Sequence, residues 1–226
     1  MKREISYNYR SPVFGVGIND ADYKTQVVFN GKNVVCPYYQ RWYDIMRRCY
    51  SDTFHKKQPE YKMFNAHPDW LYFSKFKDWM SGQQWAGKEL DKDVLHPYNR
   101  VYGPATCCFV SKNLNNFVRV GFKPKHSGLP RGVNFHGPRG TYVARVSINN
   151  RRITLGYHKT PEVAEQYYLA GRKVLFNLLA RKHHGRIAQG LQRHADVIVR
   201  SLDPLVMQRV EDNGLWMDLF EKHMKG

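Results

Sequence analysis

Acidic and imidazole side chains gather in one stretch of the chain, residues 89–117, with the sequence ELDKDVLHPYNRVYGPATCCFVSKNLNNF. Asp91 and Asp93 are two residues apart, so they would share one face of a β-strand, where their oxygens could bind Mg²⁺. His96 follows closely, and an imidazole titrates near neutral pH, as a general base must. A hard divalent ion and a base that activates water are what hydrolysis of a phosphodiester requires. The alternative is that these acids form salt bridges with nearby lysines.

A second group of chemically active side chains is a series of arginines in residues 131–171, RGVNFHGPRGTYVARVSINNRRITLGYHKTPEVAEQYYLAG. The segment reads as three short strands and one helix, with arginines at alternate strand positions. Because strand side chains alternate between two faces, Arg145 and Ser147 are expected to point outward, whereas the orientation of Val143 and Ala144 is ambiguous. Such a sheet could lie against phosphate groups.

Local signals indicate how the chain would build this sheet and its helix. Asn149–Asn150 is a turn signal, since Asn tolerates positive φ, and it predicts an antiparallel hairpin. Thr160 supplies a cap hydroxyl, Pro161 suits the first helical position, and Glu162 places an acid in the first turn. Small and aromatic residues then recur at helical spacing, at Ala164, Tyr167, Tyr168 and Gly171.

The charge of the chain favours a polyanionic partner. Its 226 residues carry a formal net charge of +17, and lysine and arginine gain free energy by releasing counterions from phosphate. Residues 121–200 hold 15 lysines and arginines against 3 acidic residues, so the excess is local to the predicted sheet module. The alternative is a generally basic, well-solvated surface.

The cysteines and the apolar runs bear on location and cofactors. Cys36, Cys49, Cys107 and Cys108 form no CxxC pair, so neither a zinc site nor a disulfide framework is expected, and a cytoplasmic setting is the default. Cys107 and Cys108 are expected to be buried strand residues. The N-terminus has no apolar leader and no run reaches the ~18 residues of a membrane span, so we expect no membrane partner.

Apolar periodicity and composition divide the chain into five predicted regions. Helical stripes are expected at Trp42, Ile45, Met46 and Cys49 and again at Trp70, Phe73, Phe76, Trp79 and Met80, and both are read as core. Beyond residue 185 the chain is again helical and basic, with Leu191, Ala195, Ile198 and Val199 on one side. The predicted regions are an arm or small hairpin at 1–33, a central domain at 34–120, a linker at 121–130, a sheet domain at 131–182 and a basic helical tail at 183–226.

The sheet segment resembles the Apetala/ethylene-response-factor (AP2/ERF) type of DNA-binding domain, which also occurs in phage and mobile-element endonucleases. The resemblance rests on Arg131-Gly132-Val133, on Gly140 before TYVARV, on Arg152 to Gly156 and on Thr160 to Ala170. It implies that the sheet enters the major groove of duplex DNA through Arg131, Asn134, His136, Arg139, Thr141, Arg145, Ser147, Arg152 and Thr154. The chain departs from the plant pattern at Arg139 and Thr154, where tryptophans are frequent, and at Arg145, where an acid is frequent, so base preference is not transferred.

The central stretch resembles the HNH (ββα-metal) nuclease motif of phage endonucleases that carry the same sheet domain. Its order is an acid-rich strand, a polar loop, a short apolar strand and the start of a helix that bears asparagines. The matching elements are Arg48-Cys49, Trp70 with Phe73, Phe76 and Trp79, Leu90-Asp91-Lys92-Asp93, Asn99, Tyr102-Gly103-Pro104, Cys107 and Asn115.

The HNH resemblance implies roles for five residues and a metal cofactor. Asp91 and the closing Asn115 would bind Mg²⁺ or Mn²⁺, and Asn99 would fix the loop. The base position falls on Lys92 or Asp93, neither of which is histidine, although His96 could substitute and Asp93 could act as a weak base. The candidate catalytic residues are therefore Asp91, Asp93, His96, Asn99 and Asn115.

Together these features predict an α+β protein with a helical N-terminal and central region that contains an HNH-like ββα unit. A three-stranded antiparallel sheet packed on one helix and a helical tail would follow. The expected function is binding of double-stranded DNA through the sheet, with metal-dependent nicking or cleavage, in a phage-infected bacterial cell. One alternative is a catalytically silent DNA-binding regulator that retains the nuclease fold. Another is a module that binds RNA or blocks a host protein.

Overall fold

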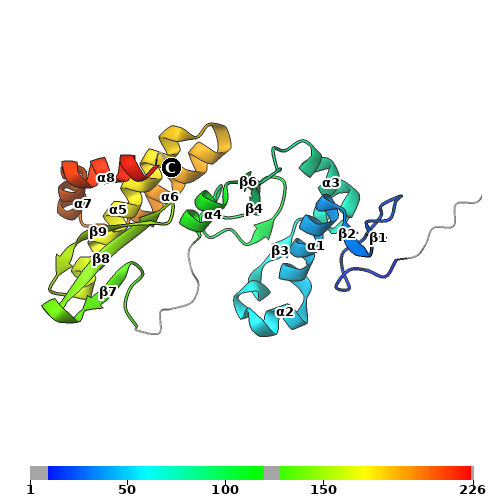
Figure 1. The fold of residues 1–226 in the computed structure, drawn as a ribbon, viewed down its shortest axis with the longest axis horizontal. Coiled ribbons are helices and arrows are strands. Elements are labelled where there is room, and N and C mark those ends of the chain that lie inside the picture. The colour runs from blue at the N-terminus through cyan, green and yellow to red at the C-terminus, as the bar shows by residue number, and fades with distance from the viewer. Residues whose placement is uncertain (1–9, 120–127, 225–226) are drawn as a thin grey trace, which may run out of the picture. The chain divides into compact units, whose positions relative to one another are not determined.

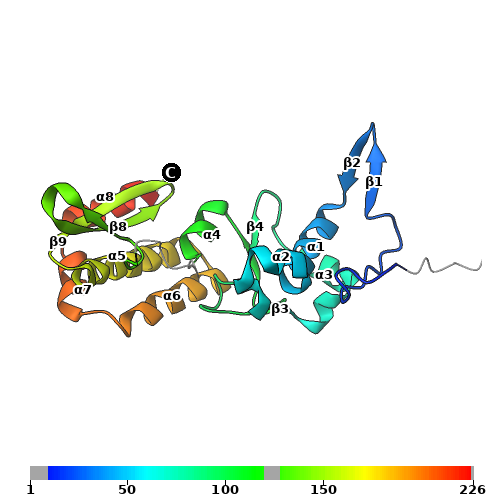
Figure 2. The same ribbon diagram turned by 90° about the horizontal axis from the view of Figure 1, so that it is seen from below.

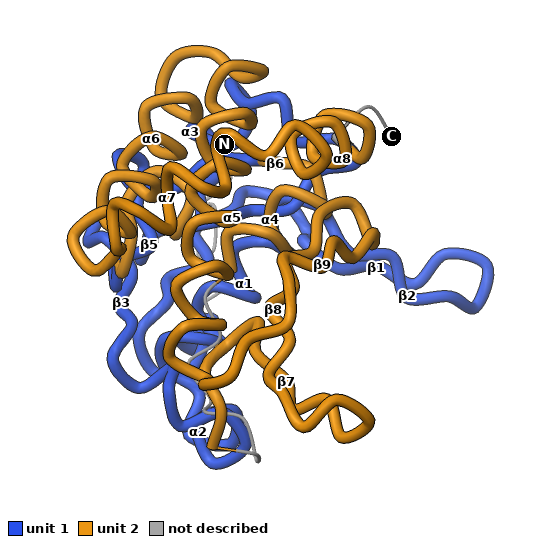
Figure 3. Tube along the Cα trace, turned by 90° about the vertical axis from the view of Figure 1, so that its left-hand side faces the viewer, with its two compact units in different colours: residues 1–92, 99–109 blue, residues 93–98, 110–226 orange. Residues whose placement is uncertain are grey.

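A computed structural model describes residues 10–119 and 128–224 (Figure 1). The chain divides into two compact units: unit 1 comprises residues 1–92 and 99–109, and unit 2 comprises residues 93–98 and 110–226 (Figure 3). Two segments of the predicted central domain, 93–98 and 110–119, therefore belong to the unit that carries the sheet. Most of the predicted linker, and the first part of the predicted N-terminal arm, lie outside the described residues.

Unit 1 is built from helices and short strands around an aromatic core. Its helices are α1 (Pro37–Tyr50), α2 (Asp52–Lys57) and α3 (Phe73–Ser81), with 3₁₀ turns at Pro59–Met63 and Pro68–Leu71. Its paired strands are β1 (Gln26–Phe29) with β2 (Lys32–Val35), β3 (Asn65–Ala66) with β5 (Val101–Tyr102), and β4 (Glu89–Asp91) with β6 (Cys108–Val110). The predicted small hairpin is confirmed, and its turn residues Asn30 and Gly31 both have positive φ.

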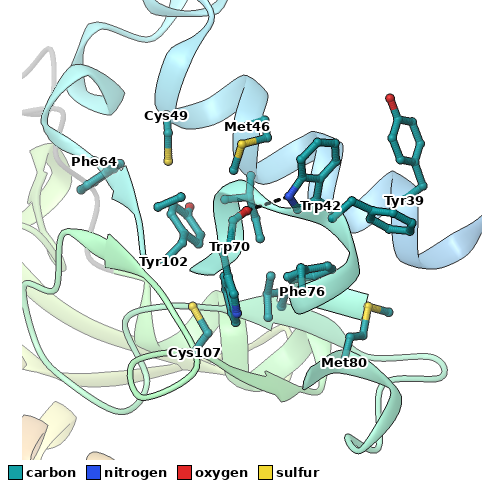
Figure 4. Close-up of a cluster of buried hydrophobic side chains, with 14 of the residues drawn as sticks. Tyr39, Trp42, Met46, Cys49, Phe64, Trp70, Phe76, Met80, Tyr102 and Cys107 are labelled. Atoms are coloured by element: carbon teal, nitrogen blue, oxygen red, sulfur yellow. Dashed lines mark hydrogen bonds between the residues drawn. The ribbon is translucent and has the colours of Figure 1, made fainter. Parts of the chain in front are cut away.

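The two helical stripes predicted in unit 1 form its core (Figure 4). Trp42, Ile45 and Met46 are fully buried, and the Trp42 Nε1 donates to the Trp70 carbonyl at 2.7 Å. The second stripe is not one helix: Trp70 lies in the preceding 3₁₀ turn, and α3 begins only at Phe73. The cause is Ile18, whose N–H donates to Leu71 O at 2.7 Å and whose carbonyl accepts from Phe73 N at 2.9 Å, which interrupts the helical hydrogen bonding.

Unit 2 contains the predicted three-stranded antiparallel sheet, in the order β7 (Val133–His136), β8 (Thr141–Ile148) and β9 (Arg151–His158). Asn149 and Asn150 close the β8–β9 hairpin with φ of 47° and 60°, as predicted. Helix α5 (Pro161–Lys182) covers one face of the sheet, where Ala144, Val146, Ile153 and Leu155 are buried. Close packing depends on glycine at two positions, because a Cβ on Gly132 would meet the Tyr168 ring at 1.9 Å and one on Gly171 would meet Leu155 Cδ1 at 2.5 Å.

Four more helices pack in unit 2. They are α4 (Lys112–Val118), α6 (Gly185–Val199), α7 (Pro204–Glu211) and α8 (Gly214–Met224). The Thr160 side chain caps α5 by accepting from Val163 N, with Pro161 at the first position, as predicted. In α6 the predicted stripe is buried at Leu191 and Ala195, whereas Val199 is 48% exposed. The structure thus confirms a mixed α+β protein with a three-stranded antiparallel sheet and a helical C-terminal region.

Candidate nucleic-acid interface and the 89–117 loop

Strand register places seven of the nine predicted DNA-binding residues on one face of the sheet. Residues that are paired across strands share a face, and the pairs here are Asn134 with Val143, His136 with Thr141, Arg145 with Thr154, and Ser147 with Arg152. We call this the outer face, because α5 packs on the opposite one. It consists of Asn134, His136, Thr141, Val143, Arg145, Ser147, Arg152, Thr154 and Tyr157.

Five of the nine outer-face residues are exposed, three are partly buried, and Val143 is only 1% exposed. Asn134, Ser147, Arg152 and Thr154 are exposed, while the side chain of Arg145 is partly buried. Helix α8 packs along β9, and the Asn149 Nδ2 at the β8–β9 turn donates to His223 O at 2.9 Å. The outer-face residues Ser147, Arg152 and Thr154 nevertheless stay exposed. The arginines of the face are therefore presented outward, on a rigid strand scaffold.

Tyr157 belongs to the outer face, although regular alternation along β9 would place it on the face that α5 covers. Simple alternation from Arg152 and Thr154 would put Gly156 outward and Tyr157 inward. The register shifts by one residue between the Val143–Tyr157 and Arg145–Thr154 pairs, and Gly156 there has φ of +114°. A bulge of this kind exchanges the faces of all later residues. An isolated glycine within a strand is the sequence signal for it, and it could have revealed Tyr157.

A polar cluster surrounds Tyr157. The Arg139 guanidinium lies 4.1 Å from the centroid of the Tyr157 ring, and the His136 ring meets the same tyrosine edge-on with 5.0 Å between centroids. Among the described residues, His136 Nδ1 and Thr141 Oγ1 are buried and have no hydrogen-bond partner. Arg139 itself lies in the 3₁₀ turn Gly137–Arg139, and it reaches the face from outside the strands. These groups could donate to or accept from a ligand that covers this end of the sheet.

Arg131, the remaining predicted DNA-binding residue, lies elsewhere in unit 2. It precedes β7 and lines a cavity of about 190 Å³ together with residues of α5 and α6, among them Tyr168, Arg172 and His194. Burial lowers the pKa of the Arg172 guanidinium, and the nearby Arg131 lowers it further. Arg131 therefore lines the helix side of unit 2, apart from the outer-face set.

Asn99 fixes the loop of the 89–117 segment within unit 1. Its Nδ2 donates to Lys92 O and to Val101 O, each at 2.8 Å, and its Oδ1 accepts from Val101 N at 3.1 Å. Lys92 is also buried: its Nζ donates to Asn99 O at 2.9 Å and lies 4.0 Å from the centroid of the Phe64 ring. Lys92, one of the two residues at the predicted base position, therefore makes structural contacts within unit 1.

Asp93 and His96 belong to unit 2, where helix α6 binds the 93–98 segment. His194 Nε2 donates to Asp93 O at 2.8 Å, and Arg193 donates to Leu95 O at 2.9 Å. A Cβ on Gly190 would lie 2.3 Å from Val94 O, so only glycine permits this approach. His96 is exposed over much of its surface. The part that is buried lowers the pKa of its imidazole, and the charges of Arg193 and Arg186 lower it further.

The remaining predicted metal ligands fall in different units. Asp91 is buried in unit 1, and Asn115 lies on α4 in unit 2. Burial and the Asp91 carboxylate raise the pKa of the Cys107 thiol, which is not suited to nucleophilic chemistry. Within residues 10–119 and 128–224 no three His, Cys, Asp or Glu side chains form a group that could hold a metal ion. Asp91 and Asn115 carry the carboxylate and amide oxygens that suit Mg²⁺, but the two residues belong to different units.

Two further findings bear on the partners of the chain. Every helix in the described part of the chain is too short or too polar to span a lipid bilayer. Comparison of the sequence and structure with protein-family models, with curated proteins and with solved structures finds no match.

Proposed function

We propose that the protein binds double-stranded DNA through the outer face of the β7–β9 sheet. The observation that carries the proposal is the register: Arg145, Arg152 and their polar neighbours Ser147 and Thr154 share one face, opposite the helix. Arg145 on this face is partly buried, and the other three residues are exposed. Arginine and small hydroxyl side chains contact phosphates and base edges in the major groove. The net charge of +17 adds counterion release to the binding free energy.

The sheet suits duplex DNA better than RNA or a single strand. The major groove of A-form RNA is too deep and narrow for side chains to read, whereas that of B-form DNA admits a pair of strands. Single strands are bound by stacking bases on exposed aromatic rings. On the outer face the Tyr157 ring, 38% exposed, is contacted by Arg139 and by His136, and the charged and polar side chains around it outnumber aromatic rings.

Competition among nucleic acids tests this proposal. Duplex DNA, a single strand and RNA of one length are titrated against the labelled complex at one fixed salt concentration, because charge alone gives all three similar salt dependence. We expect duplex DNA to compete best. Arg145→Ala should weaken duplex binding by about 1 to 3 kcal/mol, the range of a base-edge contact. Equal competition by all three, or an unchanged affinity of the variant, contradicts the proposal.

We propose as a second function that the chain is an HNH-type nuclease or a silent descendant of one. Two observations favour the scaffold: β4 pairs with β6, which α4 follows along the chain, and Asn99 makes three hydrogen bonds within the segment between β4 and β6. The base position falls on Lys92 or Asp93. Lys92 favours the silent alternative, since a buried, hydrogen-bonded ammonium group cannot act as the base, whereas an active site would depend on Asp93 or His96.

A plasmid assay with Mg²⁺ or Mn²⁺ separates the two alternatives. If the chain is active, Asp91→Ala should abolish nicking and spare DNA affinity, because Asp91 lies in unit 1 and the sheet in unit 2. Circular dichroism and an unfolding curve of the variant serve as the folding control, since Asp91 is buried. A fully active Asp91→Ala variant means that the catalytic site is misplaced. No cleavage by the wild-type protein with either ion supports the silent regulator.

A further inference from the structure

The β1–β2 hairpin exposes an unusual amount of apolar surface. Val28 is 77% exposed, Phe29 66%, Val34 48% and Val27 44%. The hairpin projects from the rest of unit 1 (Figure 2), and its strands pair with each other alone in a two-stranded sheet. Phe29 and Lys32 are paired across the strands next to the Asn30–Gly31 turn, so the tip combines an aromatic ring with an ammonium group.

Burial of this hairpin against the core does not explain its sequence. Its base is tied to unit 1 by the Cys36 N to Thr25 O hydrogen bond of 2.8 Å, while the strand residues Gln26–Phe29 are all exposed. An isolated two-stranded hairpin is marginally stable in water, and exposed apolar side chains lower its solubility. A partner that covers Val28 and Phe29 would stabilise the hairpin, which points to a role in binding.

Charge indicates the chemistry of the partner. The hairpin and the residues before it, from Tyr23 to Val35, contain Lys24 and Lys32 and no acidic residue, and the nearest acids in the chain are Asp22 and Asp44. A second copy of the hairpin would bring like charges together, whereas a polyanion would be complementary. DNA-binding proteins that insert apolar side chains between base pairs combine such a wedge with basic residues in the minor groove.

We propose that the β1–β2 hairpin is a second DNA-contacting element, which enters the minor groove and inserts Phe29 between base pairs. Lys32 beside it would contact phosphate, and the unstacked step would bend the duplex. The inference rests on the proposed duplex binding and adds to it a contact made by unit 1.

The test uses the full-length protein and duplexes that contain 2-aminopurine, a base whose fluorescence rises when it unstacks, together with end labels that report bending. Wild-type protein should raise the fluorescence and bend the duplex. Phe29→Ala should abolish both signals and weaken binding roughly tenfold, within the range of one base–aromatic stacking contact. Phe29→Leu keeps an apolar wedge and should retain most of both signals.

Two matched controls exclude general effects of the hairpin and of charge. Val34→Ala removes exposed apolar area from the stem, away from the turn, and should leave affinity within about twofold of wild type, since a single exposed methyl-rich side chain contributes little. Lys32→Gln should reduce the slope of log affinity against log salt by about one unit, while the exposed Lys75→Gln on α3 should not change it.

The outcomes separate this inference from the proposed function. If wild-type protein binds duplex DNA and Phe29→Ala keeps both the affinity and the fluorescence signal, the hairpin inference is wrong and the sheet proposal stands. If Phe29→Ala instead converts a dimer to a monomer in sedimentation, the hairpin binds a second copy, which also overturns the inference. If Arg152→Ala has no effect while Phe29→Ala weakens binding, the sheet proposal fails and the hairpin stands. Absence of any duplex binding by wild-type protein overturns both.

Discussion

Adjacent residues on β9 have different surroundings because the strand alternates. Arg152 pairs with Ser147 on the outer face, whereas Arg151 pairs with Ile148, which is buried on the face that α5 covers. Both arginines are exposed and carry the same charge. The two positions carry the same charge and point to opposite faces, and Arg151 also lines a cavity with Asn149, Lys222 and His223. They form a natural pair for separating contacts made by the outer face from general attraction to a polyanion.

His194 makes the stability of unit 2 depend on pH. Burial lowers the pKa of its imidazole below the ordinary value of 6.5, the Arg172 charge lowers it further, and the hydrogen bond to Asp93 O partly offsets these effects. Below the ordinary value the unfolded chain binds a proton that the folded chain does not, so the free energy of unfolding falls as pH drops through 6.5. Above that pH the contribution is constant.

We predict that His194→Gln flattens this dependence. Urea unfolding between about pH 7 and pH 5 should show a smaller loss of stability for the variant than for wild type, although the variant is less stable at neutral pH. His96 and His158, whose pKa values are also lowered by burial, titrate in both proteins and cancel in the comparison. Identical pH profiles for the two proteins would contradict the assignment of a neutral, structural His194.

At the residue scale, regular alternation made much of the outer face predictable. Arg145, Ser147, Arg152 and Thr154 could be placed on it because they lie in an unbroken part of the β8–β9 ladder. Regular alternation alone misplaces Tyr157, since the bulge at Gly156 inverts the faces beyond it, and only the glycine signals the change. The position of Arg131 depends on the packing of α5 and α6, which no strand pattern encodes.

At the scale of elements, the approach of α6 to the 93–98 segment depends on a single glycine. In an open helix an alanine is more favourable than glycine, but a Cβ on Gly190 would lie 2.3 Å from Val94 O and 2.8 Å from Leu95 Cα. Both contacts are backbone atoms, which cannot rotate away. The helix and the segment would have to separate, and the hydrogen bonds of Arg193 and His194 would be weakened.

We predict that Gly190→Ala lowers the free energy of unfolding of unit 2 by about 1 to 3 kcal/mol, as overpacking does in a well-packed core. Gly214→Ala, on α8, is the matched control, because a Cβ there meets nothing within 4 Å. It should leave stability within about 1 kcal/mol of wild type or raise it slightly. Chemical unfolding followed by circular dichroism gives both values, and equal effects of the two substitutions would mean that α6 does not clamp the segment.

Element prediction succeeded where the signals are local. The Asn149–Asn150 turn and the Thr160 cap of α5 follow from two or three neighbouring residues, and the structure confirms both. It failed at the start of α3, where hydrogen bonds from Ile18, far away in sequence, end the 3₁₀ turn. The packing of residues 93–98 against α6 also depends on a contact between distant residues, because Asp93 and His194 are 101 positions apart in the sequence.

At the scale of the whole molecule, the net charge gives a nonspecific affinity for polyanions, and a specific contact must be measured above it. With a net charge of +17 the protein should bind every polyanion at low salt, so a bare affinity carries little information about the site. We propose that the outer face of the sheet contacts the duplex, and that positive charge in general does not account for binding. A comparison at constant charge is therefore required.

The most direct measurement is duplex affinity for Arg152→Ala and Arg151→Ala across a series of salt concentrations. Both variants lose one charge from neighbouring positions of β9, so nonspecific attraction changes equally. The account predicts that Arg152→Ala weakens binding by about 1 to 3 kcal/mol and that Arg151→Ala changes it by less than about 0.5 kcal/mol. Equal losses for the two variants, or a larger loss for Arg151→Ala, would contradict it.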